Sequence, residues 1–458
     1  MKKIHMRSIV VYILSLFFIV GIVFFVFEFV YYGDNWAINP INSHLSGTDM
    51  ANAGSIIDKE GNILASSTNG KREYNIDKDV RISLLHTIGD GSTNISTAIQ
   101  NNFRAELFGY NIIVGLGMSS IMNTANDINL TLYSRLCKSA SNKLGNRKGT
   151  VVFYNYNTGE IVCLVSKPSY DPYNKPSESK LNSEEYDGVY INRAISSSYT
   201  PGSTFKIISS VAGLNNIPNM EDVKYECNGV MEINGEKVTC MAKHGNIALK
   251  NAFAKSCNIY FANLAMDVGR EKMNETANEM GFNKSFVVDN IPTKESYYDV
   301  SSAADVQLAW SGVGQYTNLV NPIHFMIIMG AIANNGIAAV PYILDFMKSQ
   351  SMGFKFHNSS KKYTSRILSE SNAQKLKEMM SYTTKNQYTS IFKGRDVCSK
   401  TGTAEVGEGK KPHGWIIGFS ADKTLPLAFA VIVENAGYGI STAGVIASDI
   451  MNEAASFM

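Results

Sequence analysis

The first patterned segment of the chain is a run of 19 uncharged, almost entirely apolar residues, 9–27. A helix of this length crosses the roughly 30 Å hydrocarbon core of a bilayer. Residues 1–8 carry the basic side chains Lys2, Lys3 and Arg7, so we expect this tail to be cytoplasmic and the rest extracytoplasmic. A cleaved signal peptide is the alternative, but its apolar core would be shorter and no A-x-A-like site follows. The pattern predicts a single-pass membrane anchor.

Short β-rich runs broken by turn residues predict the first strands beyond the anchor. Residues 31–45 are expected to form a linker, and residues 53–67 a strand, a turn at Glu60-Gly61-Asn62 and a second strand. Residues 70–125 are polar and mixed in pattern. We therefore expect a small, irregular, non-catalytic module over residues 28–147.

A hairpin and a later group of three strands flank a long helical stretch. Asn157-Thr158-Gly159 interrupts two β-rich runs within residues 149–166, which predicts the hairpin. Residues 203–390 have mostly helical periodicity, with loops expected at 215–246 and 283–300. Three further β-rich runs and a closing amphipathic helix are predicted over 396–403, 415–419, 427–434 and 443–457.

These elements predict one domain over residues 148–458, an α/β fold of the α+β kind. Its simplest assembly is a single antiparallel five-stranded sheet with helices on its faces. Apolar residues make up 45% of the chain and charged residues 18%, which is typical of a globular protein. The net charge of +2 gives no reason to expect a nucleic-acid partner.

Six cysteines lie beyond the anchor, at positions 137, 163, 227, 240, 257 and 398. In an oxidising compartment they could form disulfides. Cys227 and Cys240 are the favoured pair because they flank a turn-rich segment. Disulfides, free thiols and metal ligation all remain open from the sequence.

The segment TPGSTFKIISS, residues 200–210, is the first candidate for chemistry. A Pro-Gly turn precedes Ser203, which suits the start of a helix, and Lys206 lies three residues on, where the hydroxyl and amine can meet. A lysine whose pKa is lowered by burial can take the proton of a serine nucleophile. A capping serine followed by a surface lysine is the alternative, since S-x-x-K also begins at Ser177, Ser359, Ser390 and Ser420.

Two further motifs make the S-x-x-K motif more specific. Ser256-Cys257-Asn258 is an S-x-N motif between predicted helices, where Ser256 could relay a proton and Asn258 could orient a lysine; a helix cap at Ser256 is the alternative. Lys400-Thr401-Gly402 is the one K-T-G in the chain, on a predicted strand. Gly402 would let a ligand backbone approach, and Lys400 with threonine hydroxyls would hold a carboxylate. An edge strand with a solubilising lysine is the alternative.

The order S-x-x-K, S-x-N, K-T-G is that of penicillin-binding proteins and class A β-lactamases. The chain resembles the high-molecular-mass class B penicillin-binding proteins, D,D-transpeptidases that cross-link peptidoglycan. The likeness also includes TGEIVCLVSKPSYDPY, INRAISSSYTPGSTFK and GQYTNLVNPIHFMIIMGAIANNG. It is strong over about residues 148–458 and looser over 50–140, where GSIIDKEGNILA resembles the start of the family's N-terminal module.

The resemblance implies a two-step acyl transfer. Ser203 would attack the penultimate D-Ala carbonyl of a stem pentapeptide with Lys206 as general base, and the N–H groups of Ser203 and Thr403 would form the oxyanion hole. Ser256 would pass the proton to the leaving D-Ala, and Asn258 would hold Lys206 and the substrate.

The K-T-G segment would hold the substrate's terminal carboxylate through Lys400, Thr401 and Thr403. An amine of a neighbouring stem peptide would then attack the acyl-enzyme, and β-lactam antibiotics would acylate the same serine. The resemblance also implies a separate glycosyltransferase partner, because class B members lack polymerising activity.

The motifs call for no cofactor, but a zinc site is a separate hypothesis. Cys257 lies inside S-x-N and Cys398 two residues before Lys400, so both thiols could lie near the site with His413 or His244 as a third ligand. Small buried hydrophobic side chains are the alternative for both cysteines. His324 and Met326, on an apolar helix, are expected to be packing residues.

Two other functions remain as alternatives. A D,D-carboxypeptidase or a β-lactamase on the same fold would hand the acyl group to water, and acyl-enzyme lifetime distinguishes them. A β-lactam sensor or a silent division-complex scaffold would not turn over, although the complete set of motif residues argues against a silent copy.

Overall fold

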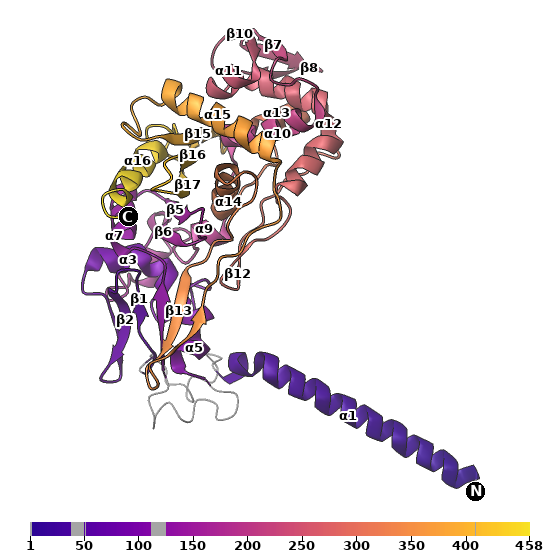
Figure 1. Cartoon of the computed structure of the whole chain (residues 1–458), viewed down its shortest axis with the longest axis vertical. Coiled ribbons are helices and arrows are strands. Elements are labelled where there is room, and N and C mark those ends of the chain that lie inside the picture. The colour runs from indigo at the N-terminus through magenta and orange to yellow at the C-terminus, as the bar shows by residue number, and fades with distance from the viewer. Residues whose placement is uncertain (1, 38–49, 51, 111–124, 408) are drawn as a thin grey trace.

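The structure, a computed structural model, describes residues 2–37, 50, 52–110, 125–407 and 409–458. The N-terminal helix α1 (Lys2–Ala37) lies apart from the folded body of the chain (Figure 1). Within it, His5–Tyr32 is the one segment among the described residues that is long and apolar enough to cross a membrane. The helix continues past residue 31, where we expected a linker, since no proline interrupts it before Pro40. Most of the expected linker lies outside the described residues.

A six-stranded sheet organises the first region, which is less irregular than its sequence suggests. Its order is β14-β13-β4-β1-β2-β3, with only β1 and β4 parallel. The strands are β1 (Ile56–Ile57), β2 (Ile63–Thr68), β3 (Lys71–Tyr74), β4 (Asn126–Leu130), β13 (Leu344–Ser349) and β14 (Lys355–Asn358). The helices of this region are α3 (Lys78–Ile88), α4 (Ile99–Asn102), α5 (Arg104–Phe108) and α7 (Ser134–Leu144).

Two strands of this sheet, β13 and β14, come from the stretch that we expected to be helical. Leu344 and Met347 are the buried apolar residues of β13, and their spacing of three also fits a helix. An irregularity in the register between Leu344 and Phe346 breaks the alternation that would have indicated a strand. Residues far apart in sequence thus complete the sheet of the first region.

The second sheet is the antiparallel five-stranded one that the sequence predicts. Its order is β15-β16-β17-β5-β6, and every neighbouring pair is antiparallel. Figure 1 shows α14 (Pro322–Ala333) and α16 (Ala443–Ala454) on opposite sides of it, which explains why β17 is buried along its whole length. The strands are β5 (Gly149–Asn155), β6 (Ile161–Lys167), β15 (Val397–Ala404), β16 (His413–Ser420) and β17 (Leu427–Val433).

A mainly helical part packs beside the K-T-G strand, β15. It contains α10 (Lys206–Asn216), α11 (Leu249–Ala254), α12 (Asn258–Glu279), α13 (Asp305–Val313) and α15 (Glu370–Gln387). Helix α15 packs against both α11 and β15, and α10 packs against α12. Shorter helices precede this part: α8 (Glu178–Leu181), η2 (Glu184–Tyr186), α9 (Arg193–Ser196) and the 3-10 turn η3 (Gly202–Phe205).

The two loops expected within this part instead contain short paired strands. These pairs are β7 (Lys224–Cys227) with β10 (Gly245–Ala248), β8 (Val230–Ile233) with β9 (Glu236–Thr239), and β11 (Val287–Val288) with β12 (Ile291–Pro292). They are only two to four residues long, so their alternation is too brief to be distinguished from loop sequence.

Candidate active site

The Pro-Gly turn places Ser203 at the tip of a buried helix, as the sequence predicts. Gly202 has a φ of +53°, in the left-handed region that favours glycine, and begins the 3-10 turn η3. Helix α10 follows directly from Lys206. Phe205 and Ile208 are fully buried, whereas Ser203 is partly exposed. The hydroxyl of Ser203 is therefore reachable from solvent while its helix is fixed in the core.

Contacts from three other segments hold the turn in place. The Trp415 indole Nε1–H donates to the Thr200 carbonyl at 3.0 Å, and the Gly202 N–H donates to the Gly314 carbonyl at 2.9 Å. A Cβ atom on Gly202 would lie 2.6 Å from the Thr403 carbonyl oxygen. Glycine is required at this position because the backbone of the K-T-G strand passes directly against the turn.

Lys206 is the centre of a polar network that joins the first two motifs. Its Nζ lies 3.1 Å from Ser203 Oγ, 2.8 Å from Asn258 Oδ1 and 2.7 Å from the Ser256 carbonyl oxygen. The Ser256 hydroxyl lies 3.1 Å from the same nitrogen. The Lys206 side chain is fully buried, so its amine is shielded from bulk water.

The S-x-N motif lies in a sharp connection between α11 and α12. Ser256 has a φ of +56°, and Cys257, not Ser256, caps α12 through its sulfur. The helix cap that we considered for Ser256 is therefore wrong, and its side chain is free to face the site. Asn258 Nδ2 donates to the Thr239 carbonyl at 2.9 Å, which leaves Oδ1 to accept from Lys206.

Lys400 reaches the same place from β15. Its Nζ donates to Ser256 Oγ at 3.2 Å and to the Thr401 carbonyl at 3.0 Å. It is fully buried, so the alternative of a solubilising surface lysine is wrong. Ser256 Oγ thus bridges the two lysines, and three distant motifs meet in one cluster.

The two buried amines have strongly lowered basicity. Burial disfavours the ammonium form of Lys206, and repulsion from Lys400 adds to this, so the pKa of Lys206 lies well below its ordinary value. Burial alone lowers the pKa of Lys400 to about 7. At neutral pH the site can therefore hold a neutral amine next to Ser203 and an ammonium near the strand.

The rest of the K-T-G segment lines the approach to Ser203. A Cβ atom on Gly402 would lie 2.7 Å from the Pro201 carbonyl, so the strand and the turn touch through two glycines, Gly402 and Gly202. Thr401 and Thr403 are partly exposed. Tyr388, which the sequence analysis missed, accepts from the Thr401 N–H at 3.1 Å and from its hydroxyl at 2.8 Å.

Two members of the hypothesised zinc ligand set, Cys398 and His413, do not lie with Cys257. Cys398 Sγ lies 3.6 Å from the Lys377 carbonyl on α15, so the strand directs it away from the S-x-N loop. His413 Nδ1 accepts from the Asn435 N–H, and its ring packs edge-on against Tyr199.

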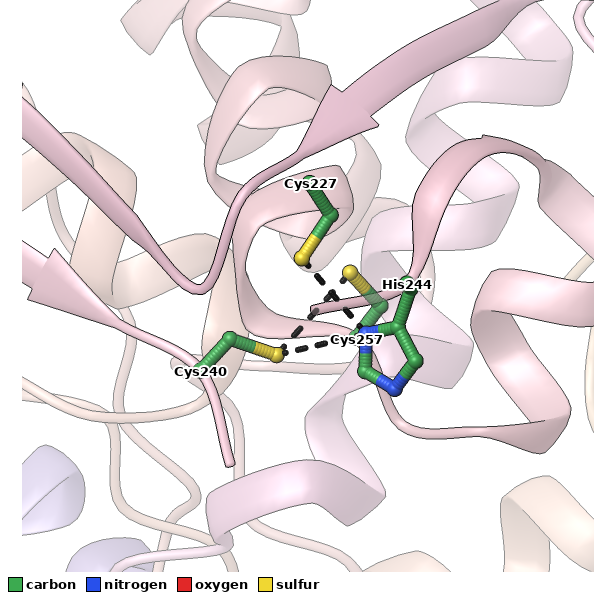
Figure 2. Close-up of side chains that lie close together, drawn as sticks. All are labelled: Cys227, Cys240, His244 and Cys257. Carbon is green, nitrogen blue, oxygen red and sulfur yellow. Dashed lines mark hydrogen bonds between the residues drawn. The ribbon is translucent and has the colours of Figure 1, made fainter. Parts of the chain in front are cut away.

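Cys257 instead lies with Cys227, Cys240 and His244, the histidine that we named as an alternative ligand (Figure 2). All six cysteines are free thiols in the structure, including the pair Cys227 and Cys240. The packing role expected for His324 and Met326 is confirmed, since both are buried in α14.

Comparisons with known proteins identify the family of the chain. A family model for the penicillin binding protein transpeptidase domain matches residues 149–452. The chain therefore belongs to the penicillin-binding protein transpeptidase family.

Individual relatives include the peptidoglycan D,D-transpeptidase PbpA of Mycolicibacterium smegmatis, 29% identical over 326 residues and 66% of this chain. The protein of the same name in Mycobacterium tuberculosis is 30% identical over 324 residues, again 66% of this chain. The matches span 65% of the length of each relative.

The solved structure of penicillin-binding protein A from M. tuberculosis, as a ceftriaxone acyl-enzyme complex, has a TM-score of 0.77 to this chain. The sequence identity is 26%, and the alignment covers 88% of this chain and 98% of that one. The class B assignment and the transpeptidase fold are thus confirmed.

Proposed function

We propose that the chain is a membrane-anchored, serine-type peptidoglycan D,D-transpeptidase. The observation that supports this best is the fully buried Lys206, whose Nζ contacts Ser203, Ser256 and Asn258 together. A bare S-x-x-K pair would leave its lysine in water, where it stays protonated and cannot act as a base.

The contacts of Lys206 support it as the group that accepts the serine proton. The Ser256 carbonyl and Asn258 Oδ1 can only accept hydrogen bonds, and at 2.7 and 2.8 Å they take both N–H groups of a neutral amine. The remaining lone pair then faces the serine hydroxyls. Lys206 accepts the proton of Ser203 as its Oγ bonds to the substrate carbonyl carbon.

The strand that carries the K-T-G motif completes the site. Gly202 and Gly402 bring the turn and β15 into contact, which supports the N–H groups of Ser203 and Thr403 as the donors to the developing oxyanion. Such a donor is worth about 3 kcal/mol. The Lys400 ammonium, with Thr401 and Thr403, binds the terminal carboxylate of the stem peptide.

Ser256 connects the two amines and so serves as the proton relay. As the tetrahedral intermediate collapses, the bond to the terminal D-Ala breaks, and its nitrogen receives the proton from Lys206 through Ser256 Oγ. An amine from a neighbouring stem peptide then attacks the acyl-enzyme, and Ser203 regains its proton. β-Lactams acylate the same hydroxyl.

Helix α1 is the proposed anchor, with the N-terminus in the cytoplasm and the catalytic domain outside. A separate glycosyltransferase is the proposed partner that supplies glycan strands. Both the donor and the acceptor stem peptides then come from material at the membrane surface.

The test combines donor and acceptor peptides in one reaction. Purified protein is given a stem pentapeptide donor and an amine acceptor, and released D-Ala and cross-linked product are measured by mass spectrometry. We expect product from the wild type and from Ser196→Ala, an exposed serine of the same segment, and none from Ser203→Ala. Equal product from Ser203→Ala would refute the proposal.

The peptide reaction, together with incubation with penicillin, distinguishes the transpeptidase from the other candidate functions. Release of D-Ala together with a tetrapeptide, and with no cross-linked product, would indicate a D,D-carboxypeptidase. Rapid turnover of penicillin would indicate a β-lactamase. Stable acylation without any peptide reaction would indicate a sensor.

A further inference from the structure

A cluster of three cysteines and one histidine lies directly behind the S-x-N motif. Cys227, Cys240, His244 and Cys257 direct their side chains toward a common centre, and their four candidate ligand atoms all lie within 4.8 Å of one another (Figure 2). His244 Nδ1 is 3.5 Å from the sulfur of Cys227 and 3.5 Å from that of Cys240. The sulfurs of Cys240 and Cys257 are 4.0 Å apart.

These separations fit the edges of a tetrahedron around one zinc ion. With Zn–S bonds of about 2.3 Å and Zn–N bonds of about 2.0–2.1 Å, tetrahedral geometry puts sulfurs about 3.8 Å apart and sulfur about 3.6 Å from nitrogen. The observed 4.0 and 3.5 Å lie close to these values. Three thiolates and one imidazole are a ligand set that closed structural zinc sites use.

The surrounding segment buries few side chains, so a metal cross-link would stabilise it. In the fully described stretch 228–246, Val238 is the one buried side chain, although this stretch contains the hairpin β8–β9. Met231 and Ile233 of the hairpin are only partly buried against the core, and a two-stranded hairpin is marginal in water by itself. Cys227 directly precedes this stretch, and Cys240 and His244 lie in its second half, so a metal shared with Cys257 would fix the stretch to the body of the domain.

Backbone donors already point at two of the sulfurs. The Asn258 N–H donates to Cys240 Sγ and the Tyr260 N–H donates to Cys257 Sγ, each at 3.4 Å. Outer hydrogen bonds of this kind orient thiolate ligands and are a usual part of a metal site. The start of α12 therefore serves both the sulfur cluster and the active site.

We propose that Cys227, Cys240, His244 and Cys257 bind one Zn²⁺ ion, which holds the S-x-N loop in its active geometry. Cys257 is the middle residue of that motif, between Ser256 and Asn258. The backbone N–H of Asn258 donates to Cys240 Sγ, and its side chain donates to the Thr239 carbonyl. Strand β9, which ends at Thr239, therefore fixes the Asn258 Oδ1 atom that accepts from Lys206. Zinc binding releases the thiol protons and requires no redox partner.

Metal content tests the site without relying on any activity. We expect about one zinc per chain in protein purified without added metal, measured by elemental mass spectrometry. Cys240→Ser and His244→Ala should lower it several-fold, and Cys137→Ser, a buried cysteine remote from the cluster, should leave it unchanged. Less than about a tenth of an equivalent in the wild type, or equal loss in Cys137→Ser, would overturn the proposal.

A second measurement uses only wild-type protein, so it does not depend on whether the variants fold. Wild-type protein stripped by a chelator is reloaded with Co²⁺, and sulfur-to-cobalt charge-transfer absorption should appear together with a tetrahedral ligand-field spectrum. An octahedral spectrum without thiolate bands would overturn the proposed ligands. So would a Cys227–Cys240 disulfide found by peptide mapping of unreduced, metal-free native protein.

The proposed role of zinc in positioning the S-x-N loop rests on the proposed function and has its own test. Stripping zinc should slow acylation by a fluorescent penicillin about ten-fold or more, and adding Zn²⁺ should restore the rate. An unchanged rate in fully stripped protein would refute the positioning role while leaving the metal site intact. Absence of labelling in the zinc-loaded protein would instead refute the proposed function.

Discussion

The contact between the Ser203 turn and the K-T-G strand can be tested by adding a single methyl group. Gly202→Ala places a Cβ atom 2.6 Å from the Thr403 carbonyl oxygen, 3.0 Å from the Thr403 carbonyl carbon and 3.1 Å from the Ala404 Cα. All three atoms belong to backbone, so no flexible side chain can move aside. Either the turn or β15 has to shift, and each carries one donor of the proposed oxyanion hole.

Two contributions set the expected magnitude. A residue other than glycine at a φ of +53° costs about 1–2 kcal/mol of folding stability. Relief of the clash to an ordinary contact needs a displacement of close to 1 Å, and misplacement of this size at a reacting centre costs on the order of 100-fold in rate. We therefore expect a modest loss of stability and a large loss of acylation.

Gly61→Ala is the matched control, because Gly61 has a φ of +89° and nothing within 4 Å of the added Cβ. Gly61→Ala should lose only the backbone cost in urea unfolding and Gly202→Ala somewhat more, because of the clash, but only Gly202→Ala should slow the second-order rate of acylation by a fluorescent penicillin. Wild-type acylation by folded Gly202→Ala would refute the argument that this contact aligns the site.

Three further predictions concern the polar network. The pKa of Lys400 is about 7, so the acylation rate should fall as the pH rises through 7 and the ammonium loses its proton. Lys400→Arg stays charged, so this fall in rate at alkaline pH should disappear in that variant. An unchanged fall would count against the assignment. Asn258→Ala removes the oxygen 2.8 Å from Lys206 Nζ and should slow acylation at least about ten-fold in stopped-flow labelling. Tyr388→Phe leaves the Thr401 N–H without its acceptor and should lower the unfolding free energy by about 1–3 kcal/mol in urea titration, and unchanged stability would contradict that role.

Much of the fold was predictable because its strands and helices are long and regular. The strands within 149–166, 415–419 and 427–434 have nearly continuous apolar runs, and burial on both faces of the sheet explains those runs. The candidate catalytic cluster was predictable for a different reason. Each motif is weak alone, but their order along the chain is specific, and the structure brings all three within hydrogen-bond distance of Lys206 or Ser256.

The contacts that the sequence could not reveal depend on register and on long-range packing. Tyr388 follows α15 directly, and nothing in its local pattern indicates that its hydroxyl meets Thr401. Cys398 shares a strand with Lys400, yet alternation along a strand does not say which neighbouring element a side chain contacts. The sulfur cluster was missed in part because three of its ligands lie in or beside the region expected to be a loop.

The central claim is that Ser203 forms the acyl-enzyme, and peptide mapping of a β-lactam adduct tests it most directly. Trypsin cleavage after Arg193 and Lys206 releases residues 194–206, which contain Ser203 and three other serines. After incubation with penicillin, we expect one adduct on this peptide, assigned to Ser203 by fragmentation and absent from Ser203→Ala. An adduct of the same yield on Ser203→Ala, or on any other peptide of the wild type, would contradict the account.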